Sequence, residues 1–156
     1  MKLNSVQIEN IESLNVGGWG GSDSKIADAL GMIRQSARFF DAIDSDGNEY
    51  EFKKQDSLQW IDLYKLACLS DSEKNITIVW ICHKNGIITS LHTCNYSELI
   101  EAMNIDQNGL DAALLCAEYN ANLGIQIKFP VKLKTIKGFT QIYKRKEDGQ
   151  NVSKTI

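Results

Sequence analysis

Apolar residues recur at helical spacing in several parts of the chain, every three or four positions along stretches that are otherwise polar. The first clear stretch follows Ser22, whose side chain makes it a favourable helix N-cap. Residues 3–15, before it, fit either a short helix or a strand. The stretches that the spacing predicts to be helical are about 25–38, 57–69, 96–103 and 108–119.

Other segments have the pattern of β-strands, with alternating positions or continuous runs of β-branched and aromatic residues. Asp46-Gly47 and Asn85-Gly86 each separate two such segments, and both dipeptides are strong hairpin signals. Pro130, the only proline, marks the end of a further strand. The predicted strands are about 39–44, 48–54, 76–83, 87–92, 124–129 and 139–145. Strands and helices are interleaved without a regular βαβ repeat, so we expect an α/β (α+β) fold with a mixed central β-sheet flanked by helices.

The length and composition are those of one globular domain. The chain has 156 residues, of which 43% are hydrophobic and 24% are charged, and this size allows one core but is short for two. No apolar run approaches the length of a membrane span, and the N-terminal residues lack the pattern of a signal peptide. We therefore expect a cytoplasmic protein with no membrane partner, whose four cysteines are reduced thiols.

Charge is distributed unevenly along the chain, although the net charge is only −3. Residues 1–123 contain 9 lysines and arginines against 18 acidic residues, whereas residues 124–156 contain 8 against 2. A basic segment on an otherwise acidic chain is one feature of proteins that bind a polyanion such as nucleic acid. A solvated basic tail would give the same pattern, so the charge alone does not separate the two interpretations.

The segment around the first predicted hairpin combines carboxylates with a lysine. Successive side chains of a strand point to opposite faces, so Glu49, Glu51 and Lys53 are predicted to share one face, with Tyr50 and Phe52 turned towards the core. Charged residues also gather by chance on the open face of a hairpin. The interpretation as a site therefore depends on a further carboxylate joining the same face.

The length of the hairpin loop decides where that further carboxylate, Asp41, points. A three-residue loop, Ser45-Asp46-Gly47 with a left-handed glycine, places Asp41 opposite Glu51 on the same face. A two-residue loop, Asp46-Gly47, would place it opposite Phe52 on the other face. The site therefore requires the longer loop or a β-bulge.

Two facing carboxylates favour a hard divalent cation, which relieves their mutual repulsion. Mg²⁺ prefers oxygen ligands and keeps several waters, so Asp41, Glu51 and the backbone carbonyl of Phe52 are the predicted metal ligands. Mg²⁺ held there would polarise a phosphate and lower the pKa of a coordinated water. Lys53 would position that water or stabilise the charge that develops on the phosphate. We therefore predict hydrolysis of a phosphodiester, with Asp41, Glu51 and Lys53 as catalytic residues.

The same residues resemble the active-site signature of the PD-(D/E)xK nuclease superfamily. Within it, the run from Asp41-Ala42-Ile43-Asp44 to Glu49-Tyr50-Glu51-Phe52-Lys53 is similar to the active-site hairpin of the PvuII-type restriction endonucleases. A second similarity runs from Pro130-Val131-Lys132 to residues 138–143. Phe40 stands where the signature has a proline, and the histidines that read bases in PvuII-type enzymes have no counterpart after the lysine.

The resemblance implies a restriction-endonuclease-like core and a Mg²⁺-dependent type II restriction endonuclease. Such an enzyme hydrolyses double-stranded DNA at a short, palindromic site and leaves 5′-phosphates. A palindromic site implies a homodimer, and a restriction enzyme implies a companion DNA methyltransferase in the same system. Two alternatives stay open: a DNA repair or junction-resolving nuclease on the same core, and a non-catalytic DNA-binding domain. The resemblance does not carry over the recognised sequence.

The expected organisation is a single restriction-endonuclease-like domain over residues 1–156. Within this domain, residues 1–38 are a candidate region for dimerisation or DNA contact. Residues 39–145 are the predicted catalytic core, and residues 146–156 are a tail.

Residues next to the predicted catalytic set are candidate DNA contacts. Lys54 and Gln55 directly follow the lysine of the signature, and both residue types can contact base edges or phosphates. Gly20 and Ser22 belong to a glycine-rich stretch in which the absence of side chains allows close approach to a DNA backbone. A polar helix start and a flexible lead into a helix are the alternative explanations of these two stretches.

Overall fold

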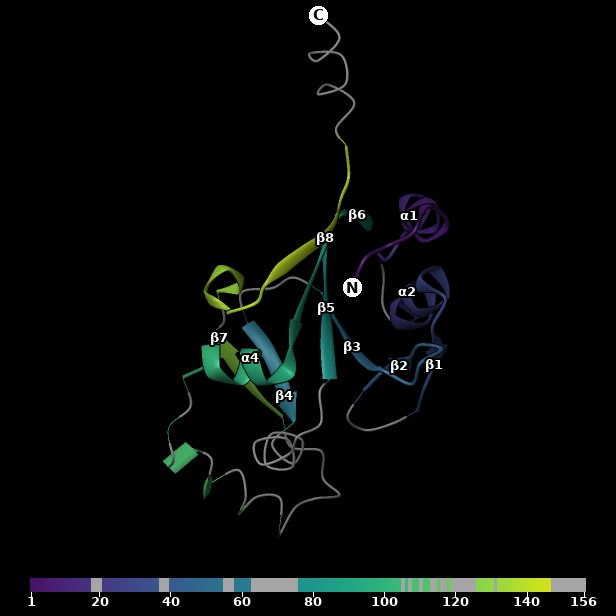
Figure 1. Cartoon of the computed structure of the whole chain (residues 1–156). Coiled ribbons are helices and arrows are strands. Elements are labelled where there is room, and N and C mark those ends of the chain that lie inside the picture. The colour runs from purple at the N-terminus through teal and green to yellow at the C-terminus, as the bar shows by residue number, and fades with distance from the viewer. Residues whose placement is uncertain are drawn as a thin grey trace, which may run out of the picture.

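The computed structural model of the chain describes residues 1–17, 21–36, 40–54, 58–62, 76–104, 126–130 and 132–146, with single positions between 106 and 118. For residues 58–62 and 126–130 only the backbone is described. The elements, shown in Figure 1, are α1 (Ser5–Glu12), α2 (Ser22–Leu30), β1 (Ile33–Arg34), β2 (Ala42–Ile43), β3 (Glu49–Lys54), β4 (Leu58–Asp62), β5 (Ile76–Lys84), β6 (Ile87–Asn95), α4 (Tyr96–Ala102), β7 (Gln126–Pro130), a 3-10 helix η2 (Leu133–Thr135) and β8 (Thr140–Lys144).

A mixed six-stranded sheet in the order β1-β2-β3-β5-β6-β8 forms the centre of the described fold. β3 and β5 run parallel, and the other neighbouring strands are antiparallel. Helices α1 and α2 lie on one side of this sheet and α4 lies on the other (Figure 1). The predicted mixed sheet flanked by helices is thus confirmed.

Both faces of the sheet are buried under apolar side chains. The cluster on the side of α1 and α2 includes Ile11, Ile26, Leu30, Ala42, Tyr50, Phe52, Val79, Ile81, Leu91 and Tyr143. The cluster on the side of α4 includes Ile76, Ile78, Trp80, Cys94, Tyr96, Leu99 and Ile136. Because side chains alternate along β3, Glu51 and Lys53 belong to the α4 side, opposite to Tyr50 and Phe52.

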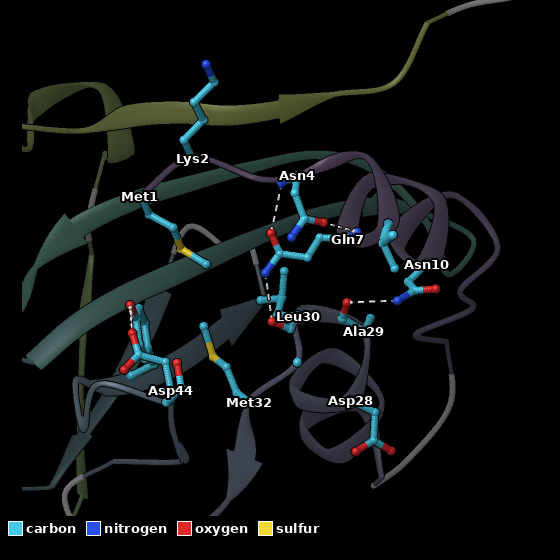
Figure 2. A pocket seen from close by; sticks show the side chains of 14 residues that line it. Met1, Lys2, Asn4, Gln7, Asn10, Asp28, Ala29, Leu30, Met32 and Asp44 are labelled. Carbon is cyan, nitrogen blue, oxygen red and sulfur yellow. Dashed lines mark hydrogen bonds between the residues drawn. The ribbon is translucent and has the colours of Figure 1, made fainter.

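Side-chain amides hold α1 against the C-terminal end of α2 (Figure 2). Asn4 and Gln7 form a capping box at the start of α1. The Gln7 amide also donates to the carbonyl of Leu30 at 2.8 Å, and the Asn10 amide donates to that of Ala29 at 3.3 Å. These amides line a pocket between the two helices and the turn after β2 (Figure 2). These amides therefore act in holding the two helices together.

Helix α2 is shorter than the sequence pattern predicts. It ends at Leu30 because Gly31 takes the left-handed conformation, φ 70°, and donates its N–H to the carbonyls of Ala27 and Asp28. Ile33, which continued the helical spacing, instead begins strand β1. The prediction of a helix over 25–38 is therefore wrong for residues 31–36, and residues 37–38 lie outside the described part. At the other end Gly21 is the N-cap, one residue before Ser22.

The predicted helix over 57–69 is wrong where the structure describes it. Residues Leu58–Asp62 form β4, which pairs antiparallel with β7 in a separate two-stranded sheet, Leu58 opposite Pro130 and Asp62 opposite Gln126. Such a pairing joins segments far apart in the sequence, so it leaves no trace in local spacing. Residues 63–69 lie outside the described part.

Most other predicted elements are present. Residues 3–15 contain a helix, α1, rather than a strand. The Asn85-Gly86 turn joins β5 and β6, and both of its residues have positive φ. Residues 39–44 yield only the short β2. The described positions between 108 and 118 are helical, and β7 ends at Pro130 as predicted. Across the described residues, no helix combines the length and the apolar character needed to cross a membrane.

Candidate active site

The β2–β3 hairpin has the three-residue loop that the site requires. The N–H of Asp44 donates to the carbonyl of Asn48 at 3.1 Å, which closes the hairpin around Ser45–Gly47. The N–H of Gly47 donates back to the carbonyl of Asp44 at 3.1 Å, and Gly47 is left-handed with φ 83°. Of the two loop lengths that the sequence left open, the structure has the longer one, with its left-handed glycine.

The Asp44 carboxylate fixes this loop, a role that the sequence analysis did not assign. It accepts hydrogen bonds from the N–H of Asp46, from the backbone and side chain of Asn48, and from the hydroxyl of Tyr50, at 2.9–3.0 Å. The side-chain bond from Asn48 is the main cause that holds the pKa of Asp44 below its usual value. Asp44 is thus a structural residue of the hairpin.

The loop sets the register that brings Asp41 to the level of Glu51. Ala42 lies opposite Tyr50 in the ladder, and the N–H of Asp41 donates to the carbonyl of Tyr50 at 2.7 Å. The Asp41 carboxylate accepts the N–H of Phe52 at 2.8 Å and is 24% exposed. The carboxylate therefore lies against the part of β3 that carries the glutamate and lysine of the signature.

Glu51 and Lys53 share the α4 side of the sheet, as predicted. In the parallel ladder they lie opposite Ile78 and Trp80, both buried on that side. The Lys53 ammonium is 3.5 Å from the Glu51 carboxylate, and the two side chains are only 10% and 17% exposed. Charges enclosed to this degree interact more strongly than charges in water. The pair is therefore a partly enclosed one and not a solvated pair on an open hairpin face.

Two further charged residues reach Asp41, and the sequence analysis missed both. Arg34 of β1 donates from Nη1 to the Asp41 carbonyl at 2.7 Å and lies 3.4 Å from its carboxylate. The other guanidinium nitrogen, Nη2, is 3.7 Å from the Asp23 carboxylate in the first turn of α2. Burial raises the pKa of Asp23, and the charge of Asp41 raises it further, while Arg34 lowers it. Asp23 is thus within electrostatic reach of the candidate site.

No sequence signal marks Arg34 or Asp23. Their approach to Asp41 depends on how α2 ends at Gly31 and turns into β1, where the predicted helix continued. With Lys53 and Lys54, they make a site in which positive and negative side chains are mixed.

The predicted DNA contacts fall in different places. Lys54 donates to the carbonyl of Val16 at 2.7 Å, so its ammonium ties β3 to the segment after α1. Ser22 is the first residue of α2 and is partly buried. Gly20 and Gln55 lie outside the described residues. Contacts between these four residues and DNA stay predictions.

The donor set around Asp41 fits Mg²⁺. Asp41 and Glu51 supply carboxylates, and the N–H of Phe52 points to Asp41. The N–H and C=O of one strand residue project to the same side, so the Phe52 carbonyl is also directed towards Asp41. Among the described residues, no three His, Cys, Asp or Glu side chains are close enough together to hold a metal ion. A metal here would therefore rest on two carboxylates, the carbonyl and water.

Comparison with known proteins adds no family to this geometry. No protein-family model matches the chain, and no curated protein sequence is significantly similar to it. The likeness to PD-(D/E)xK nucleases therefore stays an inference from the residues themselves, above all residues 41–53.

Proposed function

We propose that this chain is a Mg²⁺-dependent type II restriction endonuclease that hydrolyses phosphodiester bonds of double-stranded DNA. One observation carries the proposal. The Asp41 carboxylate accepts the N–H of Phe52, the residue that stands between Glu51 and Lys53 in β3, and these two side chains form an ion pair. An Asp, a Glu and a Lys gathered at one level of a hairpin could act together on one phosphate. The β2–β3 hairpin that carries them lies beside β5 in the mixed sheet, which agrees with a restriction-endonuclease-like core.

Each residue has a role that follows from its position. Asp41, Glu51 and the Phe52 carbonyl would hold Mg²⁺, which when bound polarises the phosphate and lowers the pKa of a coordinated water. The Lys53 ammonium, held beside Glu51, can donate a hydrogen bond to the attacking water or to a phosphate oxygen. The water oxygen bonds to phosphorus and gives up a proton to solvent, the bond from phosphorus to the 3′ oxygen breaks, and that oxygen takes up a proton. The products are a 5′-phosphate and a 3′-hydroxyl.

The partners follow from the type of enzyme. A homodimer would place one such site on each strand of a palindromic duplex, and a DNA methyltransferase would protect the host. The excess of lysine and arginine in residues 124–156 is a charge pattern suited to a polyanion. A repair or junction-resolving nuclease would use the same three residues on another substrate, and a non-catalytic domain would not need the Glu51–Lys53 pair.

Supercoiled plasmid digestion tests the proposal and separates these alternatives. The purified protein is incubated with plasmid in Mg²⁺ and in EDTA, beside the Lys53→Ala variant. We expect discrete linear fragments from the wild type in Mg²⁺ only. Cleavage confined to nicked or branched DNA would indicate a repair or junction-resolving enzyme. Equal plasmid cleavage by the wild type and by Lys53→Ala would refute the proposed mechanism.

A further inference from the structure

The guanidinium of Arg34 is anchored beside the candidate metal ligands by the backbone. Its Nη1 donates to the carbonyls of Asp41, at 2.7 Å, and of Gln35, at 3.2 Å. Arg34 itself is in β1, the edge strand of the sheet, opposite Ala42. These bonds fix one nitrogen of the guanidinium next to Asp41 without using the Asp41 carboxylate.

The contacts of Arg34 with carboxylates are longer than those with carbonyls. Nη1 is 3.4 Å from the Asp41 carboxylate and Nη2 is 3.7 Å from that of Asp23, and the Arg34 side chain is 41% exposed. Close charge-assisted bonds between an arginine and a carboxylate are about 2.8 Å long. Both ion pairs are therefore loose, and water screens them. A better ligand for either partner would replace them at little cost.

The charges around Asp41 indicate which ligands would replace the two ion pairs of Arg34. The carboxylates of Asp23, Asp41 and Glu51 stand against the cations of Arg34, Lys53 and Lys54. Burial, and then the charge of Asp41, raise the pKa of Asp23, whereas Arg34 lowers it. A divalent cation would relieve the repulsion between these carboxylates but would add two positive charges beside Arg34. An anion next to the guanidinium would then offset part of the added positive charge.

We propose that Arg34 binds the phosphate on which the candidate site acts, after Mg²⁺ has taken the Asp41 carboxylate from it. The inference rests on the proposed function, because it assumes that Asp41 holds the metal. In the resting state Arg34 is a counter-ion of Asp23 and Asp41, and it competes with Mg²⁺. In the loaded state Nη2 would face a phosphate oxygen, while Nη1 stays on the backbone carbonyls. Arg34 therefore favours binding of metal and DNA together over binding of the metal alone.

The test measures two affinities that should move in opposite directions. Mg²⁺ binding to the free protein is measured by calorimetry, and binding of a short labelled DNA duplex is measured in Ca²⁺ at a concentration that saturates each variant. Arg34→Gln should bind Mg²⁺ about tenfold more tightly, since a positive charge close to the ion is gone. It should bind the duplex about tenfold more weakly. Arg34→Lys should restore part of the duplex affinity, because it keeps the charge.

Controls separate a structural effect from the proposed one. Lys137→Gln removes the same charge from an exposed ion pair with Glu101 that shares no residue with the candidate site, and it should leave Mg²⁺ affinity unchanged. Thermal melting confirms that each variant is folded. The role of Arg34 would be overturned if Arg34→Gln bound Mg²⁺ and the duplex with the same affinities as the wild type. It would also be overturned if both affinities fell.

A further variant distinguishes an error in the role of Arg34 from an error in the proposed function. Asp41→Asn should lose Mg²⁺ binding, which would leave the metal site supported whatever Arg34 does. If Asp41→Asn binds Mg²⁺ as the wild type does, the metal site itself is wrong, and the role of Arg34 is wrong with it.

Discussion

Two glycines with the same backbone angle offer a direct test of how the hairpins are built. Gly47, in the loop that sets the register of Asp41, and Gly86, in the β5–β6 turn, both have φ 83°. An L-residue at such an angle is strained whatever its surroundings. The two positions differ in the space around them, so the pair separates backbone strain from steric clash.

The expected magnitudes follow from that space. An added Cβ at Gly47 meets nothing within 4 Å, so Gly47→Ala should cost only the backbone strain, about 1 kcal/mol. At Gly86 the Cβ would meet the Asn15 side chain and, at 2.7 Å, the backbone N of Gly17. Backbone has to move there, so Gly86→Ala should cost about 2–4 kcal/mol in all. Asn tolerates the left-handed region, so Gly47→Asn should be close to neutral.

Urea denaturation followed by circular dichroism gives these free energies of unfolding. Gly47→Ala should lower the melting temperature by about 3 °C, since 1 kcal/mol shifts a chain of this size by that amount. Equal losses at Gly47 and Gly86 would refute the clash at Gly86. No loss at Gly47, or Gly47→Asn as destabilising as Gly47→Ala, would refute the left-handed loop, and with it the register that places Asp41.

Three further changes test separate contacts. Lys54→Met should lower the free energy of unfolding by about 1–2 kcal/mol, because the Val16 carbonyl loses its donor; no change in urea unfolding would show that the contact is not formed. The lowered pKa of Asp44 stabilises the fold above about pH 4, and this contribution is lost as the pH falls through the folded-state pKa. The stability gap between wild type and Asp44→Asn should therefore shrink between pH 6 and pH 3, and a constant gap would contradict the assignment. Mg²⁺ at about ten times its Kd should stabilise the wild type by about 1.4 kcal/mol but leave Asp41→Asn unchanged in thermal melting; equal stabilisation would place the ion elsewhere.

Local turn chemistry made the hairpin and part of its site predictable from the sequence. Asp46-Gly47 contains the residue that a left-handed loop position needs, and the alternation from Glu49 to Lys53 assigns each side chain to a face. The alternation was sufficient to predict that Glu51 and Lys53 share a side. The position of Asp41 depended on the loop length, which the sequence left open and the structure shows to be three residues. Both signals depend only on neighbouring residues.

Contacts between distant segments could not be predicted in this way. β4 has a helical pattern by itself, and only its pairing with β7 makes it a strand. The helical spacing runs through Gly31 to Ile33, although the glycine is itself a stop signal. The helix predicted over 25–38 includes Arg34, so the sequence pattern gave no reason to bring Arg34 next to Asp41. The loose contacts of Arg34 with Asp23 and Asp41 therefore appear only in the structure.

The most direct test of the proposed site compares two glutamates on the same face of β3. Glu51 lies at the level of Asp41, whereas Glu49 is two residues nearer the loop, opposite Ile43. The rate of plasmid cleavage in Mg²⁺ is measured for Glu51→Gln and Glu49→Gln, which remove the same charge from the same strand. We expect Glu51→Gln to lose activity by a factor of about 10³, and Glu49→Gln to stay close to the wild type. Equal rates for the two variants would contradict the site at Asp41, Glu51 and Lys53.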